Sequence, residues 1–220
     1  MIWTGVRSLP QKIGIVTYLC QEKIGCVIIL LTMKVMKRPY RRAQETREHV
    51  LEIAGRLFYA DGIHAVGIDR VAEEARVTTT TLYRLFGSKD GLVYAYLERM
   101  DGDWFAWLER AVSEGGLPQF FDEMDEHARD PEVRGCAFRL ALTEYPAGDC
   151  AVHCLVLDNK QRARARFWDV LAAQGYEDAE SLADQLMLIM DGIEASAAGR
   201  SKDSPPGPGP LLVRKILGVD

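Results

Sequence analysis

The sequence predicts an all-α protein. No stretch of its 220 residues alternates polar and apolar side chains as a half-buried β-strand does, whereas apolar residues recur at intervals of three and four from Thr46 onward. Hydrophobic residues make up 48% of the chain and charged residues 27%, which is the balance of an ordinary soluble protein. A chain of this length can bury a substantial core without the help of disulfides.

The first part of the helical region divides into a helix, two short helices and a long one. The first apolar stripe ends at Asp61-Gly62, where glycine can take the left-handed turn that closes a helix. We expect the two short helices at about residues 69–75 and 79–86. Ser88 is a natural N-cap for the long helix, which we expect over about residues 89–112.

Beyond Gly115-Gly116 the spacing of apolar residues predicts further helices. Residues 204–210 are rich in proline and glycine and are therefore expected to form a linker or stiff loop, followed by a short apolar segment at 211–217. One helix is predicted at residues 117–127, and a second begins directly after the capping pair Asp130-Pro131. Two longer helices are predicted at residues 151–173 and from a cap at Asp178 to about residue 198.

The first 35 residues differ from the rest. Their unbroken apolar run, Ile24 to Leu31, is too short to span a bilayer, and no small-residue cleavage site follows Met33. We expect residues 1–35 to be disordered or to precede the native start. An ordered or membrane-touching extension is the alternative, but no membrane partner is expected for the working fold.

The five cysteines are an odd number at irregular spacing, which argues against a disulfide framework. A reducing cytoplasm is therefore the expected location of the protein. The residues concerned are Cys20, Cys26, Cys136, Cys150 and Cys154.

Residues 68–89 read as a helix-turn-helix, in which two short helices are joined by a tight turn and the second can enter the major groove of DNA. Leu82 and Phe86, four residues apart, supply an apolar back for the second helix. Threonine hydroxyls can bond phosphates or base edges, and threonine methyls suit the thymine methyl group. The polar front and the adjacent helix start comprise Thr78, Thr79, Thr80, Thr81, Tyr83, Arg84 and Lys89. The alternative reading of the threonine run is a polar turn with a helix cap.

The distribution of charge agrees with a DNA-binding unit. The net charge is −5, yet residues 34–90 carry 11 Lys/Arg against 8 Asp/Glu, whereas residues 91–220 carry 13 against 23. The positive charge therefore lies with the helix-turn-helix, and an acidic remainder keeps the rest of the surface away from phosphates.

Residues 46–92 resemble the N-terminal domain of the TetR family of repressors. The resemblance implies a DNA-binding domain at residues 41–91 and an effector-binding and dimerisation domain at 92–220. It also implies a ligand-responsive repressor that binds a palindromic operator as a homodimer. The matching residues are Leu57-Phe58, Gly62, Val66-Gly67-Ile68, Val71-Ala72, Val77, Thr81-Leu82-Tyr83, Phe86 and Ser88-Lys89-Asp90-Gly91-Leu92.

The same resemblance assigns contacts to double-stranded operator DNA. Thr79 and Thr80 would face bases, Thr81, Tyr83 and Lys89 would mostly hold phosphates, and Arg84 could do either. Many relatives carry glycine or proline in place of Thr80, so the base preference does not transfer. Basic residues at the start of the first helix often follow the adjacent backbone or minor groove in this family; a solvated basic tail is the alternative. These residues are Arg41, Arg42 and Arg47.

The C-terminal half carries weaker signals. Two short motifs resemble those of a TetR subgroup, but the resemblance does not indicate a ligand. They are Arg134-Gly-Cys-Ala-Phe138 and Glu144-Tyr-Pro146. An effector pocket should be apolar with a few polar groups, but most aromatic residues at helical spacing are core, and Glu144 could equally be a surface charge. The candidate pocket residues are Trp104, Trp107, Phe121, Phe138, Glu144 and Trp168; the candidate dimer face, which could instead be an intramolecular core, is Leu182, Leu186, Ile189 and Ile193.

No catalytic motif stands out, so we expect no enzyme, no cofactor and no metal. Asp149, Cys150, His153 and Cys154 have no second ligand cluster at a recognisable spacing. Cys136 would need a nearby positive charge to act as an oxidation sensor. A helix-turn-helix adaptor and a metal- or redox-sensing module remain the alternatives to a repressor.

Overall fold

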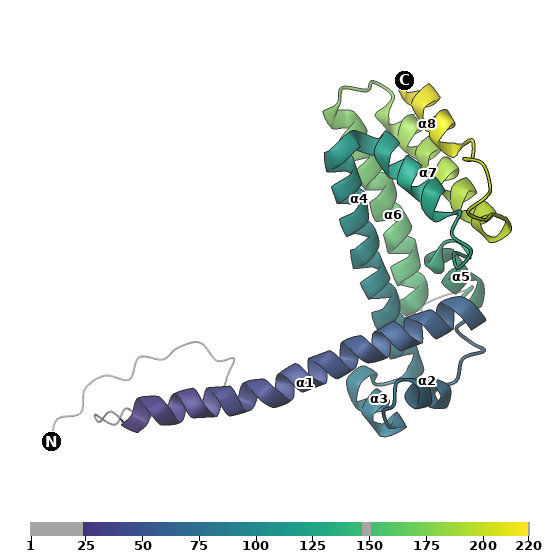
Figure 1. Ribbon diagram of the computed structural model, residues 1–220. Coiled ribbons are helices and arrows are strands. Elements are labelled where there is room, and N and C mark those ends of the chain that lie inside the picture. The colour runs from purple at the N-terminus through teal and green to yellow at the C-terminus, as the bar shows by residue number, and fades with distance from the viewer. Residues whose placement is uncertain (1–23, 147–150, 220) are drawn as a thin grey trace, which may run out of the picture. The chain divides into compact units, whose positions relative to one another are not determined.

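The computed structural model describes the backbone of residues 24–146 and 151–219, and side chains from Arg42 onward (Figure 1). Within these ranges the chain forms helices and no strands, which confirms the all-α prediction. The elements are α1 (Ile24–Asp61), α2 (Ile68–Glu74), α3 (Thr79–Phe86), α4 (Lys89–His127), α5 (Ala137–Glu144), α6 (Ala151–Ala173), α7 (Ala179–Ser196), the 3₁₀ turn η1 (Ala197–Gly199) and α8 (Gly209–Leu217).

The start of α1 differs from the prediction. We expected the helix to begin near Thr46, but it begins at Ile24, so residues 24–35 are helical rather than disordered. The helix continues through Pro39, although a proline inside a helix lacks the amide that would complete the backbone hydrogen bonding. Residues 1–23 lie outside the described part of the chain. The chain divides into two units, residues 1–46 and residues 47–220.

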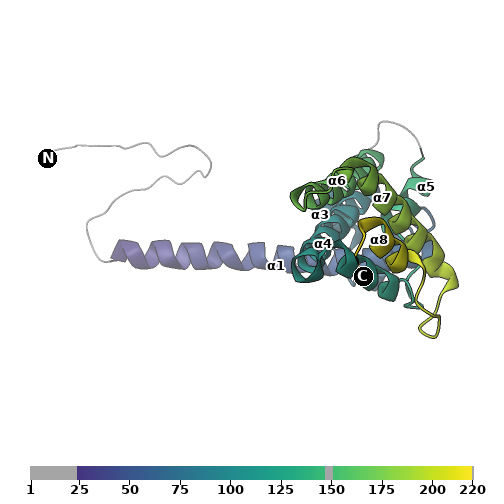
Figure 2. The same cartoon turned by 90° about the horizontal axis from the view of Figure 1, so that it is seen from above.

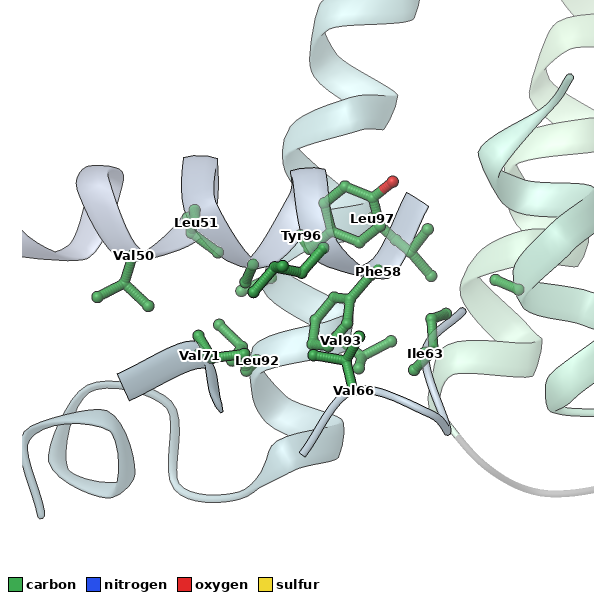
Figure 3. Close-up of a cluster of buried hydrophobic side chains, with 14 of the residues drawn as sticks. Val50, Leu51, Phe58, Ile63, Val66, Val71, Leu92, Val93, Tyr96 and Leu97 are labelled. Atoms are coloured by element: carbon green, nitrogen blue, oxygen red, sulfur yellow. The ribbon is translucent and has the colours of Figure 1, made fainter. Parts of the chain in front are cut away.

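The second unit begins with a compact helical core. The part of α1 from Arg47 onward packs with α2, α3 and the start of α4 around fully buried side chains that include Val50, Val71 and Leu92 (Figure 3). Leu82 is 1% exposed, so it forms the apolar back that we predicted for α3. Phe138 of α5 and Val152 of α6 belong to the same core. The helix-turn-helix is therefore packed directly onto the C-terminal half.

The C-terminal half has its own core between α4, α6, α7 and α8, which lie side by side in Figures 1 and 2. Phe121 and Phe167 are fully buried here. Leu186 and Ile193 of α7 are buried in the same core, so half of the predicted dimer face is intramolecular. Leu182 and Ile189 are half-buried against that core. The outward face of α7 instead carries Leu188, which is 74% exposed.

The predicted break after residue 112 is present as a kink within α4. Gly115 (φ −153°, ψ 15°) and Gly116 (φ 75°, ψ −167°) leave the helical conformation. The dihedral angles of Gly116 lie in a region that is essentially restricted to glycine. The kink redirects residues 117–127, so this segment crosses the other C-terminal helices instead of continuing away from α3 (Figure 1).

Two predicted boundaries, the start of α5 and the end of the proline-rich linker, are wrong for local reasons. A carboxylate oxygen of Asp130 accepts a hydrogen bond from the amide of Glu132 at 3.0 Å, but this makes a turn, and α5 begins only at Ala137. α7 begins at Ala179 with Asp178 in the N-cap position, as predicted, although the Asp178 side chain makes no capping hydrogen bond. α8 begins at Gly209 and so takes in the end of the predicted linker, because Pro210 in a first turn has no amide that needs a partner.

Among the described residues, none of the helices has the combination of length and apolarity needed to cross a membrane.

Candidate DNA-binding surface and ligand cavity

The start of α3 is stabilised by two of the predicted DNA contacts. The Thr78 hydroxyl accepts a hydrogen bond from the Thr81 amide at 3.2 Å and lies 2.9 Å from the Thr81 hydroxyl. Thr78 is therefore the N-cap, the role that the polar-turn reading assigned to one of the threonines. In this structure both hydroxyls bond within the helix start.

The outward face of α3 carries the remaining polar side chains. Thr80, Tyr83 and Arg84 are exposed, and half of the Tyr83 surface is open to solvent. Thr79 is half-buried. Because Leu82 points into the core, the helix is held by its apolar back and presents hydroxyl, phenol and guanidinium groups outward. This is the arrangement that a helix entering the major groove requires.

The junction between α3 and α4 is tightly built. The Ser88 hydroxyl accepts a hydrogen bond from the Gly91 amide at 3.0 Å and caps α4, as predicted. A Cβ atom on residue 91 would lie 2.0 Å from the carbonyl oxygen of Phe86, so only glycine fits there. The Lys89 ammonium donates to the carbonyl oxygen of His64 at 3.3 Å, so it also holds the loop between α1 and α2.

The three arginines predicted near the first helix start have different surroundings. The Arg47 guanidinium lies 5.4 Å from the centre of the Phe86 ring and 3.7 Å from a carboxylate oxygen of Glu48, so it packs against the back of α3. Arg42 is exposed, and its carbonyl oxygen accepts a hydrogen bond from the Thr46 hydroxyl. The side chain of Arg41 lies outside the described residues.

Glu144 does not line the large cavity described below; it binds the loop that precedes α2. Its carboxylate accepts hydrogen bonds from the amides of Ile63 (2.7 Å) and His64 (2.5 Å) and lies 2.9 Å from the His64 ring nitrogen Nδ1. Burial opposes its ionisation, but these donors outweigh burial and lower the pKa of the Glu144 carboxyl. The end of α5 is thus joined to the helix-turn-helix by a charged clamp.

A second connection joins the end of α1 to the segment before α5. The Tyr59 hydroxyl donates to the carbonyl oxygen of Gly135 at 2.8 Å and accepts from the Arg134 amide at 2.7 Å. The Arg134 guanidinium donates to the carbonyl oxygens of Tyr59 and Ala60. Neither residue was a predicted site residue, although Arg134 lies in the Arg-Gly-Cys motif that marked this segment.

A cavity of about 510 Å³ lies between α1, α4, the segment before α5 and α7. Of the predicted pocket residues, Trp104, Trp107 and Phe138 line it. Phe121 does not, because it is fully buried against Phe120 and Phe167. Trp168 does not either, because it is 45% exposed on α6. Sequence spacing identified aromatic residues but not the side of the helix that faces the cavity.

Two polar groups on the cavity wall make no hydrogen bond within the described part of the chain. Tyr96 is 5% exposed, and Figure 3 shows its hydroxyl pointing away from Ile63 and Val66 in the apolar core. Burial raises the pKa of this hydroxyl, so it remains protonated. The Glu194 oxygen Oε2 is buried without a hydrogen bond, and the Lys160 ammonium lies 3.5 Å away. Burial also raises the pKa of Glu194.

The cysteine and metal candidates have little support. Burial, together with the nearby Glu194, raises the pKa of the Cys136 thiol to about 11, which disfavours the reactive thiolate. Asp149 and Cys150 lie outside the described residues. Within the described ranges, no three His, Cys, Asp or Glu side chains are grouped so that they could hold a metal ion.

The fold and the outward face of α3 define a helix-turn-helix DNA-binding protein. Residues 50–96 match the family model described as bacterial regulatory proteins of the tetR family. The chain is 35% identical to SCO4454, a TetR-family transcriptional regulator from Streptomyces coelicolor, and the structures agree with a TM-score of 0.67 over 79% of this chain and 90% of that one. The chain belongs to the TetR family.

One further relative supports this assignment, and a second protein shares the fold. The chain is 26% identical over 152 residues to the HTH-type transcriptional regulator YjdC of Escherichia coli, covering 66% of this chain and 80% of that protein. A putative transcriptional regulator from Saccharomonospora viridis in complex with choline has the same fold, with a TM-score of 0.60 and 20% identity over 80% of this chain and 96% of that one. The protein is therefore a DNA-binding transcriptional regulator and not an enzyme.

Proposed function

We propose that the chain is a ligand-responsive repressor that binds a palindromic operator as a homodimer. The observation that carries this proposal is the position of the cavity. Its wall includes Tyr59 of α1, the helix that packs against α2 and α3, together with Trp104 of α4 and Glu194 of α7. A molecule in this cavity contacts both the DNA-binding unit and the C-terminal helices.

The described contacts supply a route from the cavity to α3. α4 runs from its cap next to α3 to the cavity wall at Trp104 and Trp107, and Glu144 clamps the loop before α2. A ligand that favours a different spacing of α1 and α4 shifts the population toward a state in which two α3 helices no longer match successive major grooves. A coupling of about 1–3 kcal/mol changes operator affinity roughly 5–150-fold.

The DNA contacts follow from the outward face of α3. Thr79 and Thr80 read bases, Thr81 and Tyr83 hold phosphates together with Lys89, and Arg84 serves either role. The exposed Tyr83 and Arg84 support this assignment directly. Lys89 exchanges the carbonyl oxygen of His64 for a phosphate, a stronger charge-assisted partner. Arg42 and Arg47 are secondary contacts.

The homodimer is supported by exposed apolar side chains on α6 and α7. These helices run antiparallel and are joined by ion pairs from Arg164 to Asp184 and from Lys160 to Asp191. Their exposed apolar side chains are Leu157 and Trp168 on α6 and Leu188 on α7. A second copy of the chain would remove these side chains from water in an isologous interface.

Ligand response is supported by the 510 Å³ cavity, which is large enough for a small organic molecule. The Saccharomonospora viridis protein of the same fold has been solved in complex with choline. At its level of identity that structure shows the fold alone, so the choice of ligand here depends on this chain's own residues.

Selection of DNA sites from random duplexes with the purified protein tests the proposal. We expect enrichment of a palindromic site. Lys89→Ala should weaken binding of the protein to this site. It should also reduce the slope of log K against log salt concentration by about 1, because one phosphate contact is lost. Tyr83→Ala should also weaken binding.

Lys202→Ala is the matched control, since Lys202 is an exposed lysine in the loop before α8 and should leave affinity and salt slope unchanged. If no palindromic site is enriched, the repressor proposal fails. An unchanged salt slope for Lys89→Ala would contradict only the assignment of Lys89 to a phosphate contact.

The dimer is tested by placing a charge on its proposed surface. Leu188→Glu should weaken self-association by about tenfold or more, because the carboxylate must lose its hydration in the interface. Sedimentation equilibrium measures the effect, and Leu211→Glu serves as the control, since Leu211 is 70% exposed on α8. If Leu188→Glu dimerises as well as the wild type, or Leu211→Glu breaks the dimer, the interface lies elsewhere.

A further inference from the structure

We infer that the cavity takes an organic cation, an ammonium group carried on an apolar or aromatic body. This inference rests on the proposed ligand response, which it deepens by naming the chemical class of the effector. Three features of the wall support it: its aromatic rings, its charge balance, and two oxygens, the Tyr96 hydroxyl and Glu194 Oε2, that accept no hydrogen bond from the other described residues.

The aromatic side chains of the cavity wall offer a ligand mainly the faces of their rings. The Tyr59 hydroxyl is already bonded to Gly135, and the Trp107 indole N–H donates to a carboxylate oxygen of Glu123 at 2.5 Å. Trp104 is held edge-on to Phe120 with ring centres 5.6 Å apart. Aromatic faces attract cations, and the attraction is strongest where water is excluded.

The charges around the cavity are mainly negative. Its two basic wall residues have acidic partners nearby: Arg56 donates to Glu74 at 3.1 Å, and Arg99 lies 3.9 Å from a carboxylate oxygen of Asp103. Such an excess of one sign raises the local concentration of the opposite ion and opposes entry of an anion. The acidic wall residues are Glu52, Asp103, Asp130, Glu132 and Glu194.

Glu194 is the acidic wall residue best placed to bind a cation directly. The single ammonium of Lys160 is shared between Asp191, at 2.7 Å, and the Glu194 oxygen Oε2, at 3.5 Å. That oxygen is buried and accepts no hydrogen bond. A buried carboxylate that shares one ammonium with a second carboxylate is only partly compensated, and a ligand ammonium would add a second positive partner.

The Tyr96 hydroxyl supplies the second contact. Tyr96 is 5% exposed and lines the cavity, and its hydroxyl makes no hydrogen bond to the other described residues. A phenol oxygen can accept an N–H of a protonated amine, and its dipole can orient toward a quaternary ammonium. Glu194 on α7 and Tyr96 on α4 would then bind one ligand from two helices, and Tyr96 also belongs to the core shared with α1.

A set of three similar molecules tests the inference. Phenyltrimethylammonium, its uncharged isostere tert-butylbenzene and the anion benzenesulfonate are titrated into the full-length protein without DNA, and the quenching of tryptophan fluorescence is measured. We expect the cation to bind at least about tenfold more tightly than either of the others. Equal or tighter binding of the isostere or the anion, or no binding of the cation at millimolar concentration, would overturn the inference.

Substitutions locate the site. Glu194→Gln keeps the shape of the side chain and should weaken binding of the cation by about tenfold, while Glu180→Gln, an exposed carboxylate on the same helix, should have no effect. Tyr96→Phe should weaken binding several-fold and covers the case in which Glu194→Gln fails to fold, as judged by circular dichroism. Unchanged affinity in the folded variants would contradict the assignment of these contacts.

Operator release separates this inference from the proposed function. If phenyltrimethylammonium binds as expected but leaves operator affinity unchanged, the ligand class stands and ligand response fails. If only the neutral or the anionic probe releases the operator, ligand response stands and the inference of a cation is wrong.

Discussion

Asp125→Ala is expected to lower the free energy of unfolding by about 3–5 kcal/mol, because it leaves a buried positive charge without its partner. The Asp125 side chain is 3% exposed and accepts from the Arg200 guanidinium at 2.6 Å. It also accepts from the Gly207 amide at 3.0 Å and lies 3.8 Å from Arg129. This one carboxylate therefore attaches the loop before α8 to α4.

Asp122→Ala is the matched control on the same helix. Asp122 is 40% exposed and pairs with Arg214, and an exposed pair of this kind contributes about 0–1 kcal/mol. Urea unfolding should show a large fall in midpoint for Asp125→Ala and a small one for Asp122→Ala, with similar slopes. Comparable losses in the two variants would mean that burial does not set the strength of the Asp125 interactions.

The same variant has a defined pH dependence. Burial opposes ionisation of Asp125, but the Arg200 and Gly207 donors outweigh it, so its pKa in the folded protein lies below the usual value of 3.8. A carboxyl with a lowered folded pKa stabilises the protein above its unfolded pKa and loses that contribution as the pH falls through the folded pKa. The difference in the free energy of unfolding between the wild type and Asp125→Ala should therefore become smaller below pH 3.8.

Phe121→Ala is expected to cost about 3–5 kcal/mol of stability, as is usual for truncating a fully buried phenylalanine. Its ring lies 5.5 Å from the centre of Phe120 and 5.7 Å from that of Phe167, and none of its surface is exposed. Because Phe121 does not line the 510 Å³ cavity, ligand affinity of the folded variant should remain near that of the wild type.

Trp104→Ala is expected to reduce ligand affinity more, and stability less, than Phe121→Ala does. Trp104 is half-buried and lines the cavity, so its truncation should cost less stability and more ligand affinity. Thermal unfolding and the phenyltrimethylammonium titration measure the two effects on each variant. A Phe121→Ala protein that stays folded but no longer binds the cation would place Phe121 in the binding site after all.

The sequence by itself determined the helix-turn-helix and most helix ends. α3 lies at residues 79–86 as predicted, Ser88 caps α4, and α4 breaks at Gly115-Gly116. These features depend on interactions within a few residues: a side-chain oxygen reaching the amide three positions on, or a glycine whose backbone angles other residues avoid. Such signals are local and can be read without knowing the fold. The predicted start of α1 was wrong because the helix continues through Pro39, a residue that usually interrupts a helix.

Only the tertiary structure decided which distant residues meet. Glu144 clamps the loop before α2, Phe121 is core and Trp168 is exposed, although the sequence suggested all three for a pocket. The cavity groups Tyr96 and Glu194 come from helices almost a hundred positions apart in the sequence and were not predicted. Helical spacing specifies which residues share a face, but the packing of one helix against another decides whether that face meets core, cavity or solvent.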